Sequence, residues 1–129
     1  MHDNARIALE FFAAIEAGDE EKMRSLAAPG ARFLQNTGGP GMSLDTLIKM
    51  SAGIHRALPD RRYENHVRSA TDTGFVEEHD FVATLPGGEQ FRLPAAVIAT
   101  VEDGRITEMH EYIDSAGAAK IRQALGGQP

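Results

Sequence analysis

Three acids and a histidine stand side by side at Glu77, Glu78, His79 and Asp80 in an otherwise apolar stretch. The surrounding segment, GFVEEHDFVATLPGG, has the composition of a β-strand that runs into a tight turn. Carboxyl groups that share a pocket with little water cannot all ionise cheaply, so at least one of their pKa values should rise. Such a group can accept a proton from carbon or water, or donate one to a leaving oxygen. The stretch therefore predicts acid–base chemistry if its carboxyl groups point into a pocket.

The face on which each acid lies decides this question, because alternate residues of a strand point to opposite sides. One face carries Glu78 and Asp80, and the other carries Glu77 and His79. The second face has the larger apolar neighbours, such as Phe81. Alternation alone therefore favours the second face as the core.

The first half of the chain is predicted to be mostly helical. Apolar residues recur at helical spacing over residues 4–17, and Gly18 is suited to the end of that helix. Asp19 and Ser43 are suited to cap a second, short helix and a third one. The second helix is expected to end at residues 29–30 and the third by Pro59, with a brief strand over residues 31–36 between them.

The second half is predicted to be a meander of long strands. Four segments with a period of two are joined by short turns rich in glycine, which requires antiparallel neighbours. A short closing helix is expected from a cap at Ser115 through Leu125. Helices followed by such a meander indicate an α+β fold with helices on one face of the sheet. The predicted strands are residues 63–71, 75–85, 91–101 and 105–114.

Length and composition restrict the possible functions. The 129 residues fit one domain, 1–129, of ordinary globular composition. A net charge of −6 argues against a nucleic-acid partner, and without cysteine neither disulfides nor thiolate chemistry is possible. No segment has the roughly 20 apolar residues of a membrane helix, and the N-terminus does not resemble a signal peptide. We therefore expect a cytoplasmic protein that does not bind membranes.

The order of elements resembles the nuclear transport factor 2-like fold, a cone in which a curved, mainly antiparallel sheet wraps around N-terminal helices and encloses a pocket. The second half is more specific. Its TLPGG turn, EDGRIT turn and EYID strand end resemble SnoaL-like proteins, closest in pattern to the limonene-epoxide hydrolase and polyketide cyclase groups. These motifs are mostly structural, so they indicate a family more strongly than a reaction.

The resemblance also implies positions for the site. Asp80 matches a carboxylate on the third strand of such epoxide hydrolases, and Glu111 matches a second one on the last strand. Asn36 matches an asparagine that helps to hold the attacking water. Glu78 replaces an arginine between the carboxylates and Leu34 replaces a water-holding tyrosine, which argues against epoxide hydrolysis. On the same register the pocket is lined by Leu34, Val82, Leu93, Ala95, Val97, Met109 and Ile113.

Two functions follow from this interpretation. The first is a cofactor-independent enzyme, without a metal, that acts on a small, largely apolar organic molecule by aldol-type cyclisation, isomerisation or a related proton transfer. Asp80 would be the general base, Glu111 its partner or the general acid, Glu78 a modulator of their pKa values, and Asn36 an orienting group. The second is a non-catalytic module of the same fold that binds a small ligand or dimerises. Apolar residues on both faces of the sheet suggest a homodimer.

Two other constellations compete with this site. Glu77 and His79 share a face, as do Glu108 and His110 on the last strand, and the four are expected to converge opposite the pocket in an interface. His66 is a single histidine that could line the mouth of the pocket. The segment GGPGMS superficially suggests a phosphate-binding loop, but it lacks the lysine and the parallel sheet of such loops.

Overall fold

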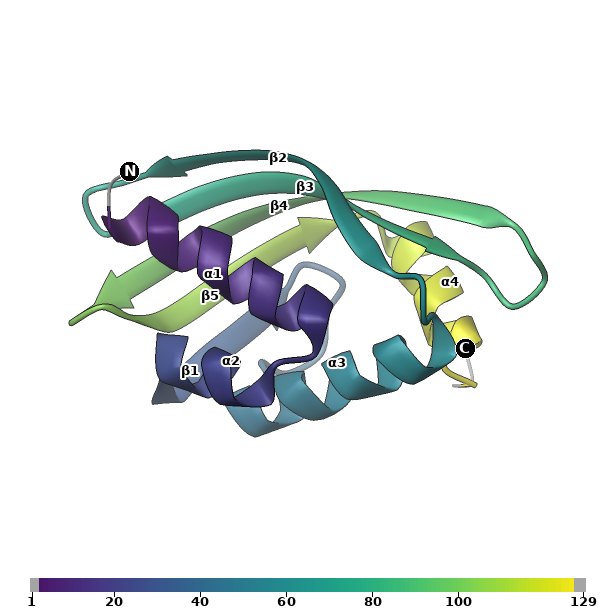
Figure 1. Cartoon of the computed structure of the whole chain (residues 1–129), viewed down its shortest axis with the longest axis horizontal. Coiled ribbons are helices and arrows are strands. Elements are labelled where there is room, and N and C mark those ends of the chain that lie inside the picture. The colour runs from purple at the N-terminus through teal and green to yellow at the C-terminus, as the bar shows by residue number, and fades with distance from the viewer. Residues whose placement is uncertain (1–2, 127–129) are drawn as a thin grey trace.

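The computed structural model describes residues 3–126. Within them, helices come first and a meander of strands follows (Figure 1). No helix in this part of the chain is long and apolar enough to cross a membrane. The elements are α1 (Asp3–Ala17), α2 (Glu20–Leu26), β1 (Ala27–Gln35), α3 (Leu44–Ala57), β2 (Arg62–Ala70), β3 (Gly74–Thr84), β4 (Gln90–Glu102), β5 (Arg105–Ile113) and α4 (Ser115–Ala124).

The strands form one sheet in the order β1-β5-β4-β3-β2. Neighbours from β2 to β5 are antiparallel, as their short connections require, whereas β1 lies parallel to β5 at the edge. The sheet is curved and arches over the helices (Figure 1). The predicted α+β cone with a curved, mainly antiparallel sheet is therefore confirmed.

The first strand differs from the prediction. It begins at Ala27 and contains Pro29 and Gly30, which were expected to end the preceding helix. Proline cannot donate to a sheet, but it is tolerated on an edge strand such as β1. The pairing of β1 with β5 shifts register between Ala27 and Arg32, which accommodates this segment.

Side-chain caps fix the starts of three helices. The carboxylate of Asp19 accepts a hydrogen bond from the backbone N–H of Lys22, and the Ser43 hydroxyl accepts one from that of Thr46. Asp114 caps α4, one residue before the expected Ser115. Each cap satisfies an N–H group that has no partner inside its helix.

The helices cover one face of the sheet, and alternation along β4 shows which face. Phe91, Leu93, Ala95, Val97 and Ala99 are buried, and the residues between them are exposed. The buried set packs against α1 and α3 in the hydrophobic core. We call this covered side the inner face of the sheet and the opposite side the outer face.

A bulge in β2 changes which of its side chains point inward. The pairing of β2 with β3 shifts register between Glu64 and Val67, and Asn65 adopts a positive φ of 58° there. Tyr63 pairs with Phe81 before the bulge, and Arg68 pairs with Glu77 after it. Residues five apart would face opposite sides of a regular strand, so the bulge brings both onto the inner face.

Candidate active site

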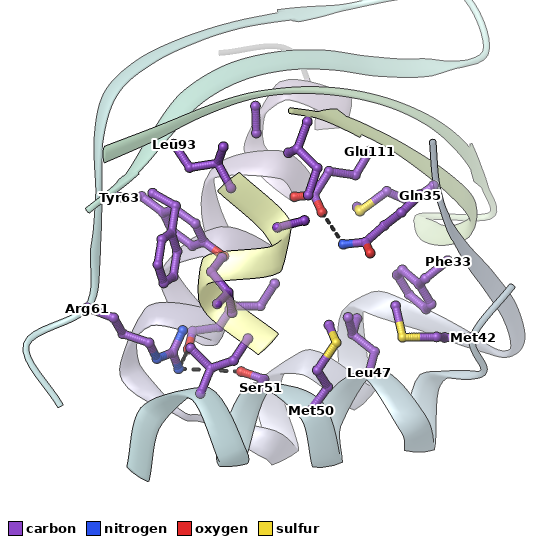
Figure 2. Close-up of a pocket in the computed structure, with 18 of the residues that line it drawn as sticks. Phe33, Gln35, Met42, Leu47, Met50, Ser51, Arg61, Tyr63, Leu93 and Glu111 are labelled. Carbon is purple, nitrogen blue, oxygen red and sulfur yellow. Dashed lines mark hydrogen bonds between the residues drawn. The ribbon is translucent and has the colours of Figure 1, made fainter. Parts of the chain in front are cut away.

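A cavity of about 240 Å³ lies between the inner face of the sheet and helices α1, α3 and α4 (Figure 2). Most of its lining is apolar, including Phe12, Phe33, Met50 and Leu93. A concave, mostly apolar site with a few polar groups is typical of small-molecule pockets. The polar lining residues are Gln35, Ser51, Arg61, Tyr63, His79, Glu111 and Arg122.

Strand pairing explains why some of these polar side chains share a face. Gln35 on β1 pairs with Glu111 on β5, which pairs with Val97 on β4, which in turn pairs with Glu77 on β3. Residues that pair directly point to the same side of a sheet. His79 lies two residues after Glu77 and therefore also points inward. Two neighbouring rows of paired residues thus place four polar side chains on the inner face, namely Gln35, Glu111, Glu77 and His79.

The carboxyl group of Glu111 is held by the side chain of Gln35. Gln35 Nε2 donates a hydrogen bond of 2.6 Å to Glu111 Oε1 (Figure 2). Burial raises the pKa of Glu111 above its ordinary value, and the hydrogen bond from Gln35 offsets only part of this rise. A carboxyl group in this state can donate or accept a proton nearer neutral pH than an ordinary one.

The His79 imidazole is fixed in one orientation. Its side chain is 1% exposed, and Nδ1 lies 2.6 Å from Glu77 Oε2. The ring packs between Phe12 and Tyr63, with centroid distances of 4.8 and 4.4 Å. Among the described residues, the buried Nε2 has no hydrogen-bond partner. If Nδ1 carries the proton, its N–H donates a hydrogen bond to Glu77. The unprotonated Nε2 can then act as a base.

Glu77 is a fully buried carboxylate, and three side chains stabilise its charge. Arg68 Nε donates to Oε1 at 2.7 Å, and Nδ1 of His66 lies 3.0 Å from Oε2, which also contacts His79. Burial alone would raise the pKa of Glu77, but hydrogen bonds from His79, Arg68 and His66 together lower it below its ordinary value. Glu77 therefore stays ionised and orients His79.

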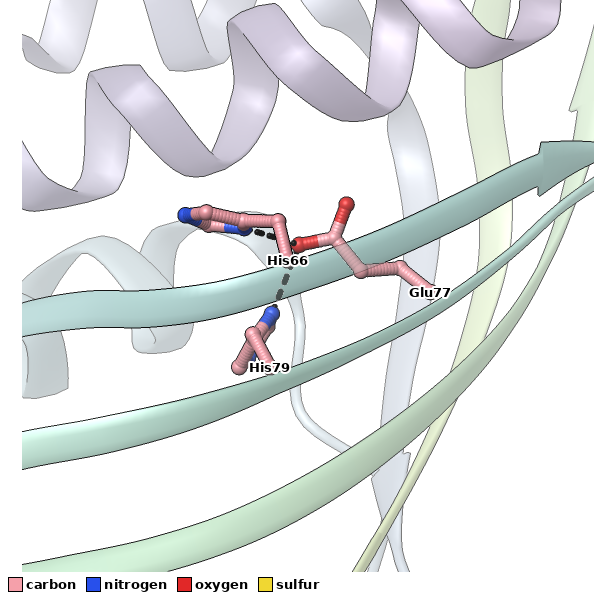
Figure 3. Close-up of side chains that lie close together, drawn as sticks. All are labelled: His66, Glu77 and His79. Carbon is pink, nitrogen blue, oxygen red and sulfur yellow. Dashed lines mark hydrogen bonds and ion pairs between the residues drawn. The ribbon is translucent and has the colours of Figure 1, made fainter.

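The same cluster also has side chains of the kinds that bind metal ions. Ligand atoms of His66, Glu77 and His79 lie within 4.8 Å of one another (Figure 3), and this combination of ligands suits a transition metal. However, the Arg68 guanidinium contacts two of the three residues, at 2.7 Å from Glu77 and 3.0 Å from His66. A cation would compete with that fixed positive charge. The geometry favours a hydrogen-bonded network that positions His79.

Asp80 and Glu78 lie on the outer face, so the prediction that they point into the pocket is wrong. Asp80 Oδ2 accepts hydrogen bonds from Asn65 Nδ2 at 2.9 Å and from Arg92 Nη1 at 2.8 Å. These two bonds lower the pKa of Asp80 below its ordinary value, the reverse of the expected shift. A register that differs by one residue exchanges the two faces of a strand, and the register implied by the resemblance differed in this way.

The other predicted site residues divide into two groups. Asn36 is exposed, and its Oδ1 accepts from the backbone N–H of Ile113, so it holds the end of β5 instead of lining the cavity. Val82 is buried on the same face as Asp80, and Val97 is buried in the core beside the cavity. The remaining predicted residues line the cavity, namely Leu34, Leu93, Ala95, Met109, Ile113 and Glu111.

The expected cluster of two histidine–glutamate pairs does not form. Glu77 and His79 point inward, whereas Glu108 and His110 pair with each other at 2.5 Å on the exposed surface. Thr100 pairs with Glu108 and Ile98 with His110, which places both on the outer face.

Sequence reasoning missed five of the polar lining residues, namely Gln35, Ser51, Arg61, His79 and Arg122. Gln35 and Ser51 carry no motif, and Arg61 follows the helix in a loop. Alternation along β3 was the signal that could have found His79, because its flanking residues are the more apolar ones. Tyr63 also lines the cavity, where burial and the charge of Glu111 raise its pKa.

The raised pKa of Glu111 predicts how a substitution changes stability with pH. The fold favours the protonated carboxyl, so its contribution to the free energy of unfolding is full below the ordinary pKa of 4.5 and is lost as pH rises through the folded value. Glu111→Gln cannot titrate. Its stability relative to wild type should therefore increase with pH over this window, by at most about 1.4 kcal/mol per pH unit.

Urea denaturation of both proteins between acidic and neutral pH measures this difference. Glu78→Gln is the matched control, because it removes a carboxylate from the outer face of the same sheet. A constant difference between wild type and Glu111→Gln over the whole range would contradict the burial of Glu111.

The fold matches those of several solved structures. IdmH from Streptomyces antibioticus, assigned as a candidate polyketide cyclase, has a TM-score of 0.74 at 21% identity, over 97% of this chain and 99% of that one. A candidate polyketide cyclase from Xanthomonas campestris pv. campestris has a TM-score of 0.79 at 18% identity, over 92% and 96%. A nuclear transport factor 2-like protein from Burkholderia xenovorans LB400 has a TM-score of 0.76 at 18% identity, over 92% and 95%.

At these identities the likeness shows the fold alone. No curated protein matches the chain. A family model for the SnoaL-like domain, however, matches residues 8–109, which is most of the chain. The match includes β3, β4, α3 and most of α1. The chain therefore belongs to the SnoaL-like domain family, and its fold is like that of the nuclear transport factor 2-like protein above.

Proposed function

We propose that the protein is an enzyme that transfers protons on a small, largely apolar organic molecule without an organic cofactor. One observation carries the proposal: an oriented imidazole with an unpartnered nitrogen, His79, shares an apolar cavity with a carboxyl group of raised pKa, Glu111. Pairs of titratable groups whose environments differ in this way are typical of acid–base sites.

The proposed reaction begins at a carbon next to a carbonyl group. His79 Nε2 takes the proton from that carbon, and the electron pair of the C–H bond moves toward the carbonyl oxygen. Glu111, protonated, donates its proton to that oxygen, so that an enol forms. In an isomerisation, His79 returns the proton to a different carbon of a conjugated enol while the enol oxygen gives its proton back to Glu111. In an aldol-type ring closure, the enol carbon instead attacks a second carbonyl group, whose oxygen takes the proton from His79, while the enol oxygen gives its proton back to Glu111. Glu77 positions His79 and Gln35 positions Glu111.

The family favours this class of reaction over epoxide opening. Two of the similar structures carry names of candidate polyketide cyclases, whose reaction is a ring closure. Epoxide hydrolysis has less support, because Asp80 and Asn36 both lie outside the cavity. A cytoplasmic location stays a prediction from the sequence.

Proton exchange at carbon tests the proposal without knowledge of the substrate. A panel of cyclic ketones and 1,3-diketones is incubated with the protein in D₂O, and deuterium uptake is followed by NMR. His79→Gln should slow the catalysed exchange at least about 100-fold, because it removes the general base. Glu111→Gln should slow it as well, and Asp80→Asn should leave it near the wild-type rate.

Asp80→Asn is the matched control, since it removes the carboxylate next in sequence to His79 but on the outer face. Exchange that survives His79→Gln and Glu111→Gln, or that is lost in Asp80→Asn, would refute the assigned roles. No catalysed exchange with any compound, together with ligand-induced stabilisation, would favour the non-catalytic binding module instead.

We also propose that the outer face forms a homodimer contact. Val67, Val76, Ile98 and Tyr112 are exposed there, with exposed fractions of 63%, 37%, 52% and 46%. Val76 and Ile98 are direct cross-strand neighbours. Apolar side chains gathered on one face of a sheet are typical of protein interfaces.

Light scattering measures the oligomeric state. The wild-type protein should be a dimer at micromolar concentration, and Ile98→Lys should shift it to a monomer, because a charge buried in the contact would have no partner. Leu9→Lys changes an equally apolar, exposed residue on α1 and should leave the dimer intact. A monomeric wild type would contradict the proposal.

A further inference from the structure

Arg61 is a buried cation that has no carboxylate partner among the described residues. Its residue is 6% exposed, and it lies in the loop between α3 and β2, where it lines the cavity. Nη2 donates to the backbone carbonyl of Ile15 at 2.5 Å and to the Ser51 hydroxyl at 3.4 Å. Within residues 3–126 its Nε is buried and has no acceptor.

The charge of Glu16 favours the charged form of Arg61, but burial outweighs this effect. The carboxylate of Glu16 is occupied by the backbone N–H of Tyr63, at 2.7 Å, and forms no ion pair with Arg61 among the described residues. Burial lowers the pKa of Arg61 below its ordinary value, which reflects poor solvation of the charge. A buried charge without a partner is strongly unfavourable, and arginine remains charged in proteins. Among residues 3–126, no acceptor lies within hydrogen-bond distance of its Nε.

Other charged clusters in the described part of the chain are already paired. On the outer face Arg92 pairs with Asp80 and Glu64, and Glu64 also pairs with Arg62, while Glu77 is surrounded by donors. Arg122 also lines the cavity, but it is exposed on α4 and keeps contact with water. In the described part of the chain, Arg61 and His79 are the cavity residues that hold a buried polar atom without a partner, and of the two Arg61 carries the fixed charge.

We propose that Arg61 and Ser51 form a subsite for an ionised oxygen group, so that the cavity selects organic anions: largely apolar molecules with a carboxylate or an acidic enol or phenol. The planar guanidinium presents a fork of N–H donors that matches such an oxygen group, and the Ser51 hydroxyl can add another donor. This inference deepens the proposed function and rests on it for the presence of a ligand in the cavity.

The position of the subsite determines how a bound ligand would be oriented in the cavity. Arg61 and Ser51 lie beside α3, whereas Glu111 and Gln35 lie on the other side of the view, with Leu47 and Met50 at the lower edge of the cavity (Figure 2). An anion held at Arg61 would extend its apolar body toward Glu111. The charged end of the ligand would thus be kept away from the carboxyl group that exchanges protons.

Binding of a matched pair of probes tests the subsite. 2-Naphthoate and 2-naphthamide have nearly the same shape and differ in charge. Calorimetry at neutral pH should show that the wild-type protein binds the acid about 10- to 100-fold more tightly than the amide, because a charge-assisted pair replaces an unmet donor. Arg61→Gln should abolish this preference while amide binding persists, and Arg61→Lys should keep part of it.

Arg122→Gln is the matched control, since it removes an exposed arginine of the same cavity and should retain the preference. Equal binding of acid and amide, or binding of neither up to the solubility limit, would overturn the inference. So would a preference that survives Arg61→Gln or disappears in Arg122→Gln. If Arg61→Gln does not fold, because it also loses the bond to Ile15, Ser51→Ala decides: it should reduce the preference several-fold, and an unchanged preference overturns the subsite.

Failure of this inference is distinguishable from failure of the proposed function. Binding of the probes requires no turnover, so the acid preference would be measured even in a protein that catalyses no exchange. Conversely, deuterium exchange that depends on His79 but comes with no acid preference would overturn the subsite alone.

Discussion

The buried carboxylate of Glu77 is the interaction on which the site depends. A carboxylate with no exposure to water is tolerable only where donors surround it, and Arg68, His66 and His79 supply them. The bulge in β2 is what turns Arg68 inward to meet Glu77. The same contact fixes the His79 ring between Phe12 and Tyr63. One set of contacts around Glu77 thus neutralises the buried charge and orients the imidazole, and it depends on the bulge in β2.

The apolar lining keeps water away from the polar groups of the cavity and so determines their chemistry. Apolar side chains from α1, α3, α4 and the inner face of the sheet surround Glu111, and this burial is the main reason for its raised pKa. The same burial leaves Arg61 with fewer acceptors than donors. Both groups are unfavourable for folding and useful for binding or proton transfer, as expected where stability is exchanged for function. A cavity with more water would solvate both groups, so that Glu111 would lose its raised pKa and Arg61 its unmet donor.

Much of the fold could be predicted from the sequence, because local sequence patterns determine it. Short turns required antiparallel neighbours, and the capping residues Asp19 and Ser43 were recognisable. It was harder to predict which side chains of β3 point inward, since a shift of one residue exchanges Asp80 for His79. Apolar flanks favoured the correct face, but the register implied by the resemblance outweighed them. Gln35 and Arg61 could not be predicted, because their roles arise only when distant segments meet around the cavity.

The position of the proton on His79 is the most direct test of the central claim, that Glu77 orients this ring as a base. Nitrogen NMR of the protein labelled with ¹⁵N at histidine distinguishes the two neutral tautomers. At neutral pH the proton should reside on Nδ1, opposite the Glu77 carboxylate, and Nε2 should be unprotonated; Glu77→Gln should disturb this distribution. A proton on Nε2, or a spectrum that Glu77→Gln leaves unchanged, would contradict the claim.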